Sequence, residues 1–252
     1  MPVLLIASVL LQFVCLVHMV RSGRPYWWIW VIMLGSYLGV AVYFFTQILP
    51  ELRHDPAGRR LVRNVRDRID PEHQRRRIAQ QLDVADTVEN RRRLAEESLR
   101  LGDYTNAAEL YRSVLKGIYA TDPAFLLGLA QSLAGLGDHA GARDTLDALI
   151  RANPQFRSDE GHFLYARCLE ALGENDRALE EYSVLATSYP GEEARLRYGR
   201  LLKSLNRPRD ARRVFEDMLK RAKAAPKYYR RKEQAHLDAA KQELAELAPA
   251  TE

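Results

Sequence analysis

Cysteine is nearly absent from this 252-residue sequence, which contains only Cys15 and Cys168. Two cysteines so far apart make neither a metal-binding nor a redox spacing, and they exclude a disulfide framework as the basis of the fold. This scarcity favours a reducing compartment for the charged part of the chain. Glycine-rich phosphate loops, nucleophile elbows, C-x-x-C pairs and H-E-x-x-H motifs are missing as well. The sequence therefore predicts no enzyme, no metal site and no cofactor.

Charge is missing from the start of the chain. No Asp, Glu, Lys or Arg precedes Arg21, and none occurs over residues 25–50. The two uncharged runs cover residues 3–20 and 26–49. As helices rising ~1.5 Å per residue they would be about 27 and 36 Å long, close to or above the roughly 30 Å of a hydrocarbon core. We predict that residues 1–50 form a two-helix transmembrane hairpin.

The alternative is a cleaved signal peptide followed by a single span. It is not favoured, because no basic residue precedes the first apolar run and no A-x-A-like cleavage site occurs before Arg21. The short segment between the runs, "RSGRP" at 21–25, instead suits a tight turn between two antiparallel helices.

Aromatic residues gather directly after this turn, where the second run begins. Tyrosine and tryptophan side chains prefer the level of the lipid headgroups. Gly35 and Gly39 are spaced so that two membrane helices can approach closely, although glycine is also common in membrane helices generally. The residues expected at the membrane interface are Arg21, Arg24, Tyr26, Trp27, Trp28 and Trp30.

Arginines follow the second run closely: six lie within residues 53–68, against two in the turn. Since basic segments stay on the cytoplasmic side, this excess places the remaining chain in the cytoplasm, at a bacterial-type inner membrane. Residues 51–87 are expected to be a basic linker with a helix starting at Asp70 and arginines against anionic lipid. RNA is the alternative partner, but no aromatic residues accompany the arginines for base stacking. We predict no nucleic-acid partner.

The segment "RSGRPYWWIWVIMLGSYLGVAVYF" (21–44) resembles the N-terminal membrane module of cardiolipin-synthase-type phospholipase D enzymes. The likeness consists of an arginine-containing turn, a tryptophan-rich start and a second span with glycine and tyrosine. These enzymes attack phosphodiesters with H-x-K-x-x-x-x-D, and none of the six histidines here is followed by lysine two places on. The resemblance therefore implies a membrane hairpin without the lipid-synthesis activity.

A repeat runs through the remaining chain, and four segments align without gaps. Each has glycine or asparagine where a helix would end in the left-handed conformation. Each has alanine five places after that position and a large apolar residue four places later. A small residue also lies seven places before that position, just upstream of each segment, namely Ala95, Ala130, Ala166 and Gly199. The small residues let two helices approach closely, and the large one fills the space against the next pair. The segments are "LRLGDYTNAAELYRSVL" (99–115), "AGLGDHAGARDTLDALI" (134–150), "EALGENDRALEEYSVLA" (170–186) and "KSLNRPRDARRVFEDML" (203–219).

This pattern resembles the tetratricopeptide repeat. The resemblance covers residues 88–226 and implies an all-α fold, an α-solenoid of about four helix hairpins. The second and third segments match best, whereas the fourth replaces glycine with Asn206 and carries Pro208 where an aromatic residue is common. Residues 227–252 are expected to be a capping helix and tail, because a stack of repeats needs cover for its last apolar face.

In tetratricopeptide repeats the first helices line a concave groove that holds peptides or partner helices. Carried over onto this sequence, the resemblance implies a mostly basic groove with an apolar floor, suited to an acidic extended segment or a C-terminal carboxylate. The asparagines of the family's carboxylate clamp are absent, and the alternative is that these positions are only solvated helix faces. The groove positions are Arg92, Glu96, Arg100, Leu127, Gln131, Phe163, Arg167, Glu170, Leu196, Arg200 and Lys203.

Together these features predict a membrane-anchored scaffold or adaptor that binds a protein partner through its groove. A tether raises the effective concentration of the partner site, so a modest groove affinity suffices. Two alternatives remain. One is an accessory subunit of a membrane lipid- or envelope-synthesis enzyme, and the other, with the opposite topology, is a periplasmic chaperone-like module. The sequence does not indicate an oligomeric state.

Overall fold

The computed structural model of the chain comprises two compact units, Met1–His73 and Gln74–Glu252, and each is described by itself. The regular structure of the described residues is helical, without strands. Most of the predicted linker 51–87 lies outside the described residues, as do Arg24 and Gly35. The residues that the structure describes are 2–22, 25–34, 36–43, 46–47 and 70–247.

Three helices make up the described part of the N-terminal unit: α1 (Pro2–Arg21), α2 (Trp28–Leu34) and α3 (Ser36–Tyr43). Each of them contacts the other two. Their shared core is small and apolar. Its buried side chains are Cys15 and Met19 from α1, Trp28 and Ile32 from α2, and Val40 and Tyr43 from α3.

The second apolar run is not one helix, in contrast to the single span predicted for residues 26–49. Helix α2 ends at Leu34, α3 begins at Ser36, and the two pack against each other. A Cβ added to Gly39 would lie 1.9 Å from the carbonyl oxygen of Val31. In a continuous helix, residues eight apart are separated by about 12 Å along the axis. The chain therefore folds back on itself within the second run. Because Gly39 has no side chain, its backbone can lie close to that of Val31.

Within the part of the chain that the structure describes, no helix combines the length and the apolar character that crossing a membrane requires. The prediction of two transmembrane spans is therefore not supported. The N-terminal unit nevertheless exposes many large apolar side chains, which we call the N-terminal apolar surface. It comprises Leu10, Leu11, Phe13, Val14, Val17 and Val20 of α1, and Tyr26, Trp27, Trp30, Met33, Leu38 and Val42 beyond it.

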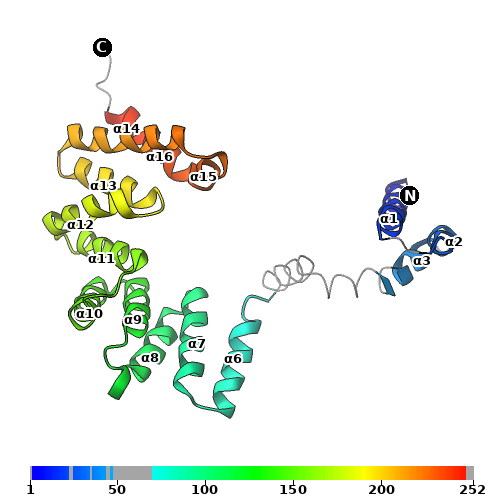
Figure 1. Ribbon diagram of the computed structural model, residues 1–252, viewed down its shortest axis with the longest axis horizontal. Coiled ribbons are helices and arrows are strands. Elements are labelled where there is room, and N and C mark those ends of the chain that lie inside the picture. Colours follow the sequence, from blue (N-terminus) through cyan, green and yellow to red (C-terminus); the bar gives the residue numbers. More distant parts are fainter. Residues whose placement is uncertain (1, 23–24, 35, 44–45, 48–69, 248–252) are drawn as a thin grey trace. The chain divides into compact units, whose positions relative to one another are not determined.

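The second unit is a succession of helix pairs (Figure 1). From α7 onward each helix packs against the next one in the chain, and α16 packs against both α13 and α14. This arrangement is the predicted α-solenoid of four hairpins with a terminal cap. Its helices are α6 (His73–Val84), then the pairs α7 (Val88–Arg100) with α8 (Tyr104–Val114), α9 (Pro123–Gly135) with α10 (His139–Ala152), α11 (Asp159–Ala171) with α12 (Asn175–Ser188) and α13 (Glu193–Ser204) with α14 (Pro208–Ala224), and last α15 (Lys227–Lys232) and α16 (Gln234–Leu247).

Local sequence ends the first helix of each pair at the predicted position. The backbone there enters the left-handed region, which glycine adopts readily and asparagine tolerates. In the first two pairs an aspartate, Asp103 or Asp138, then accepts a backbone hydrogen bond from the residue three places on and caps the second helix. The φ angles are 79° at Gly102, 82° at Gly137, 75° at Gly173 and 57° at Asn206.

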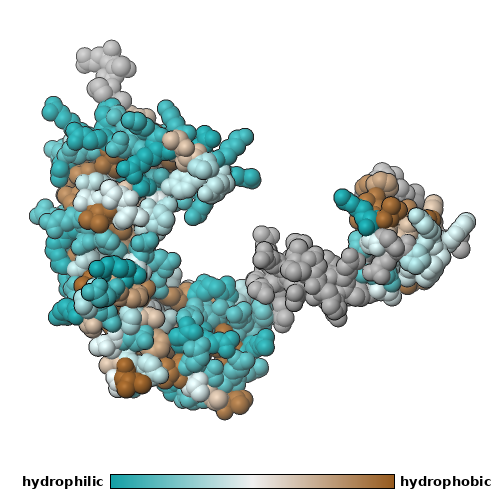
Figure 2. Space-filling view, in the orientation of Figure 1, coloured by the Kyte–Doolittle hydropathy of each residue, from teal (hydrophilic) through white to brown (hydrophobic). Residues whose placement is uncertain are grey.

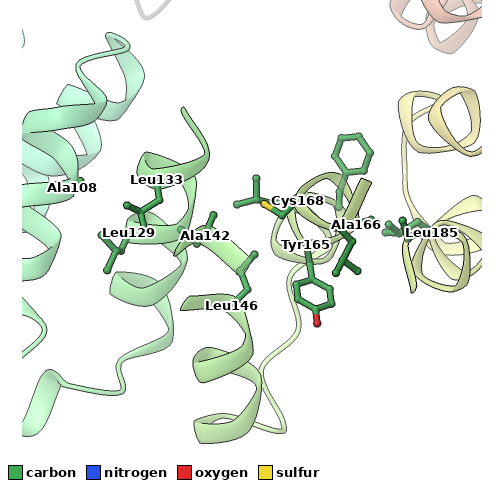
Figure 3. Close-up of a cluster of buried hydrophobic side chains, with 14 of the residues drawn as sticks. Ala108, Leu129, Leu133, Ala142, Leu146, Tyr165, Ala166, Cys168 and Leu185 are labelled. Carbon is green, nitrogen blue, oxygen red and sulfur yellow. The ribbon is translucent and has the colours of Figure 1, made fainter. Parts of the chain in front are cut away.

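The small and large residues of the repeat pack against each other as predicted. In the fourth pair, a Cβ on Gly199 would come within 2.3 Å of the Phe215 ring, so only glycine fits beneath that ring. Figure 3 shows the equivalent packing in the middle of the stack, where Ala142 and Leu146 of α10 lie between Leu129 of α9 and Tyr165 of α11. The predicted small residues Ala95, Ala107, Ala130, Ala142, Ala166, Ala178 and Ala211 are all fully buried.

Candidate functional site

The predicted groove positions lie on α7, α9, α11 and α13, and their surroundings differ from one helix to the next. On α7 the charges are satisfied within the helix. Arg92 pairs with Glu89 at 2.8 Å and with Glu96, and Arg100 pairs with Glu97 at 2.6 Å. This end of the groove is therefore an ion-paired helix face, not a free basic surface.

The middle of the groove brings three predicted residues together. Gln131 of α9 and Phe163 and Arg167 of α11 line one pocket of about 460 Å³, which we call the central groove. Tyr104 at the start of α8 and Tyr189 after α12 line it as well. The ring centroids of Phe163 and Tyr189 are 4.9 Å apart, so the pocket has an aromatic wall.

Arg167 is the predicted groove cation whose charge stays available. Its side chain is exposed, and its guanidinium carbon lies 5.8 Å from the centroid of the Phe163 ring, a cation–π distance. It forms no ion pair with any residue between 70 and 247. Stacking on one ring face orients the guanidinium while leaving its N–H donors free for a carboxylate.

Two carboxylates also line the central groove, and the sequence reasoning missed both. Glu160 lies at the start of α11 and Glu193 at the start of α13, each three residues before a position that had been assigned to the groove. The same offset rule would have found them, because residues three apart share a helix face. The central groove is therefore of mixed charge rather than mostly basic.

Glu170 lies beside a neighbouring pocket of about 420 Å³, which Arg167 and Arg197 also line. A nitrogen of Arg197 lies 3.4 Å from a carboxylate oxygen of Glu170, and the hydroxyl of Tyr182 donates to the same oxygen. Burial and this carboxylate raise the pKa of Tyr182 well above its usual range. Glu170 thus interacts with Tyr182 of α12 and Arg197 of α13, and these contacts link adjacent repeats.

The predicted positions on α13 are buried or ion-paired, in contrast to the mostly basic groove expected at this end. Leu196 is only 4% exposed and packs in a core that α13 shares with α14 and α16. Arg200 contacts Glu243 of α16 at 2.7 Å, and Lys203 contacts Glu243 at 2.7 Å and Glu246 at 2.6 Å. These two carboxylates raise the pKa of Lys203. The cap therefore neutralises the basic residues at the C-terminal end.

Leu127 faces a different pocket from its predicted companions. This pocket, of about 270 Å³, lies among α9, α10, α11 and α12, with Leu149, Ile150 and Phe156 as apolar lining. His162 also lines it, and its Nε2 lies 2.6 Å from a carboxylate oxygen of Glu181. Leu127 therefore does not contribute to the central groove.

The aromatic residues predicted at a membrane interface divide into two groups. Tyr26, Trp27 and Trp30 are 76%, 56% and 73% exposed, and Arg21 is exposed as well. Trp28 is 8% exposed, stacks on Trp27 and packs edge-on against Tyr43. It is a core residue of the N-terminal unit, because the fold-back of α3 covers it.

Among the residues that the structure describes, no three His, Cys, Asp or Glu side chains converge as metal ligands would. His162 pairs with Glu181 in a pocket that Ser158 also lines, and the Ser158 hydroxyl caps α11 by accepting the backbone N–H of Gly161. The arrangement suits binding by side-chain contacts in the central groove.

Comparison with known families supports the prediction of tetratricopeptide repeats. Two family models, both described as tetratricopeptide repeat, match residues 98–160 and 160–191. These residues are tetratricopeptide repeats. The pair α13–α14 lies beyond the matched residues, yet it has the same turn and the same small-to-large packing. Neither model reaches residues 21–44, and the resemblance of that segment to a phospholipase D-type membrane module is not supported.

Solved structures show the same fold. The chain is similar to TTC0263, a thermophilic tetratricopeptide-repeat protein of Thermus thermophilus, at 18% identity over 67% of this chain and 87% of that one, with a TM-score of 0.51. It is also similar to the TPR-like repeats of a putative kinesin light chain of Podosopora anserina, at 18% identity over 63% and 87% of the two chains, with a TM-score of 0.50. No curated protein sequence matches the chain.

Proposed function

We propose that this tetratricopeptide-repeat protein is a scaffold that holds an extended segment of a protein partner in its central groove. The observation that carries the proposal is the guanidinium of Arg167, which has no ion-pair partner among the described residues and lies against an aromatic wall in a pocket that all four helix pairs line. Repeats of this kind form extended binding surfaces rather than catalytic sites.

The lining of the central groove indicates the chemistry of the bound segment. Arg167 would pair with a carboxylate, either an acidic side chain or a chain terminus. Gln131 carries both an amide donor and an acceptor, which suits the backbone of an extended peptide. Phe163 and Tyr189 would contact an apolar side chain. Glu160 and Glu193 would repel a uniformly acidic segment, so the favoured ligand carries its carboxylate beside an apolar or basic residue.

We further propose that residues 1–50 attach the scaffold to a bacterial-type inner membrane, with the repeats on the cytoplasmic side. The N-terminal apolar surface supports this proposal, because monomeric soluble proteins rarely expose so many large apolar side chains together. The excess of arginine after residue 50 supports the orientation. An attached scaffold concentrates weakly bound partners at one surface.

Partner binding is tested by placing a photo-crosslinkable side chain at Gln131 and identifying the crosslinked protein by mass spectrometry. Arg167→Glu is expected to weaken the association at least about thirtyfold, since breaking a paired charge costs roughly 2–5 kcal/mol. The matched control is Arg213→Glu, which makes the same charge change at an exposed site on α14. If both variants lose crosslinking equally, or if neither variant loses it, the central groove is rejected as the binding site.

Attachment and orientation are tested on the full chain in bacterial cells. Membrane fractions are washed with alkaline carbonate, which releases surface-bound proteins and retains spanning ones. A reporter active only in the cytoplasm, and another active only outside it, are fused after Glu252. We expect the chain in the membrane fraction and the cytoplasmic reporter active. Activity of the external reporter would instead favour the envelope-chaperone alternative, and recovery in the soluble fraction would reject attachment.

A further inference from the structure

The end of the solenoid carries a concentration of positive charge that neither the repeats nor the groove explain. Residues 218–232 contain seven basic residues and no acidic one, between Asp217 and Glu233. We call these seven residues the basic patch. They are Lys220, Arg221 and Lys223 of α14, and Lys227, Arg230, Arg231 and Lys232 of α15.

All seven side chains of the basic patch are exposed. Lys232 lies 3.8 Å from Glu233, and the other six pair with no acidic residue in the described part of the chain. Elsewhere on the solenoid, basic residues such as Arg200 and Lys203 are paired across helices at 2.7 Å. Close like charges repel one another, so an unpaired cluster is stabilised by an external anion.

The fold holds the basic patch outward. Helix α14 buries Ala211, Phe215, Met218 and Ala222, which lie along one face, so Lys220, Arg221 and Lys223 point away from the core. Figure 2 shows the surface over this end of the solenoid as mainly hydrophilic.

The position of α15 is set by a buried polar cluster. The hydroxyl of Tyr229 donates to Glu192 at 2.8 Å, and the backbone N–H of Glu192 donates to Glu233 at 3.1 Å. Both carboxylates are buried, at 2% and 5% exposure. With Tyr229 held inward, its neighbour Tyr228 is 76% exposed among the lysines and arginines.

We propose that the basic patch binds the phosphate headgroups of an anionic lipid surface, with Tyr228 at the headgroup level. Clustered lysines and arginines are attracted to anionic membranes, and tyrosine prefers the membrane–water interface. Single-stranded nucleic acid is less well matched, because its bases stack on several aromatic platforms and the patch exposes one. The inference does not depend on attachment through residues 1–50, since the patch belongs to the other unit.

The experiment uses the full chain with a fluorophore at Ala224→Cys, an exposed site between Lys223 and Lys227. The native Cys15 and Cys168 are buried and stay unlabelled. Accessibility of the fluorophore to a water-soluble quencher is compared on phosphatidylcholine vesicles and on vesicles that also contain phosphatidylglycerol. We expect shielding only on the anionic vesicles, reversed by high salt. A fluorophore at Ile118→Cys, which is 89% exposed, should respond to neither.

The triple variant Lys223→Glu, Lys227→Glu and Arg231→Glu should weaken shielding by anionic vesicles about a hundredfold or more. The charge-matched control, Arg112→Glu, Arg151→Glu and Arg209→Glu, should leave it unchanged. Equal shielding on both vesicle types, or an unaffected triple variant, would overturn the proposal. Tighter shielding by an RNA oligonucleotide than by anionic vesicles would overturn it in favour of nucleic acid. Attachment through residues 1–50 is measured separately, as flotation of the chain with the neutral vesicles.

Discussion

Replacing Leu10 and Val14 by arginine together is expected to release the chain from membranes. The two side chains are 60% and 59% exposed and lie one helical turn apart on α1. Each replacement removes an apolar side chain whose burial in lipid is worth about 1.5–3 kcal/mol. The pair therefore weakens lipid contact by at least about 3 kcal/mol, more than a hundredfold in the partition constant. The measurement is the ratio of pelleted to soluble chain in cell fractions.

The control for this variant is Val84→Arg with Ile118→Arg, two positions on the other unit that are each 89% exposed. It adds the same charge without touching the N-terminal apolar surface and should leave the ratio unchanged. Because Leu10 and Val14 are exposed, their replacement should not unfold the repeats, and the helical circular dichroism signal checks this. A double variant that stays in the membrane fraction would contradict attachment through α1.

Glu192→Ala is expected to destabilise the C-terminal end of the solenoid strongly. The Glu192 carboxylate is 2% exposed, lies 3.0 Å from the guanidinium of Arg195 and accepts the hydrogen bond of Tyr229. Removing one partner of a buried ion pair leaves the other charge unpaired, which costs about 3–5 kcal/mol. The free energy of unfolding, measured with urea, should fall by that amount.

The adjacent Glu193→Ala is the matched control. The Glu193 side chain is 39% exposed and lies 3.5 Å from Arg197, so its loss should cost less than about 1 kcal/mol. Tyr229→Phe keeps the ring and removes only the hydroxyl, for an expected loss of about 1.5–3 kcal/mol. Equal effects of Glu192→Ala and Glu193→Ala would show that the cluster does not hold α15 in place.

The repeat architecture could be predicted from sequence because its determinants are local and recur. Glycine or asparagine ends a helix through its own backbone conformation, as the positive φ at Gly137 and Asn206 shows. A small residue at a fixed distance, such as Ala142, then sets how closely the paired helices approach. Each repeat contains the same residue types at the same spacing. The pattern can therefore be recognised without knowledge of contacts between residues that are distant in the chain.

The central groove was only partly predictable. Gln131 of α9 and Phe163 and Arg167 of α11 were predicted as groove positions, and the structure brings them to one pocket. Their sequence positions could not reveal that Arg167 has no ion-pair partner within residues 70–247, while Arg200 is neutralised by Glu243, forty-three residues away. Whether a charged side chain is paired depends on which helices pack side by side. Assigning groove positions from a family resemblance, one residue at a time, gives no information about that packing.

The N-terminal unit shows a different limit. The hydropathy of a segment is the same whether it forms one long helix or two short helices that fold back on each other. Hydropathy depends only on the residue types and not on their contacts. The approach of Gly39 to Val31 is a contact between helices and becomes visible only in three dimensions. The same fold-back turns Trp28 from a predicted interface residue into a core residue.

By itself, the sequence determined that this protein is all-α, that its second part is a stack of tetratricopeptide helix pairs, and which residues form their turns and core. Those features follow from backbone preferences and from side-chain volumes that act within one repeat or its neighbour. The tertiary structure alone decided that, among the described residues, Arg167 and most of the basic patch have no ion-pair partner, whereas Arg200 and Lys203 are paired with carboxylates of the cap. Electrostatic pairing acts across helices that are distant in the chain, so it depends on the packing that the repeats build.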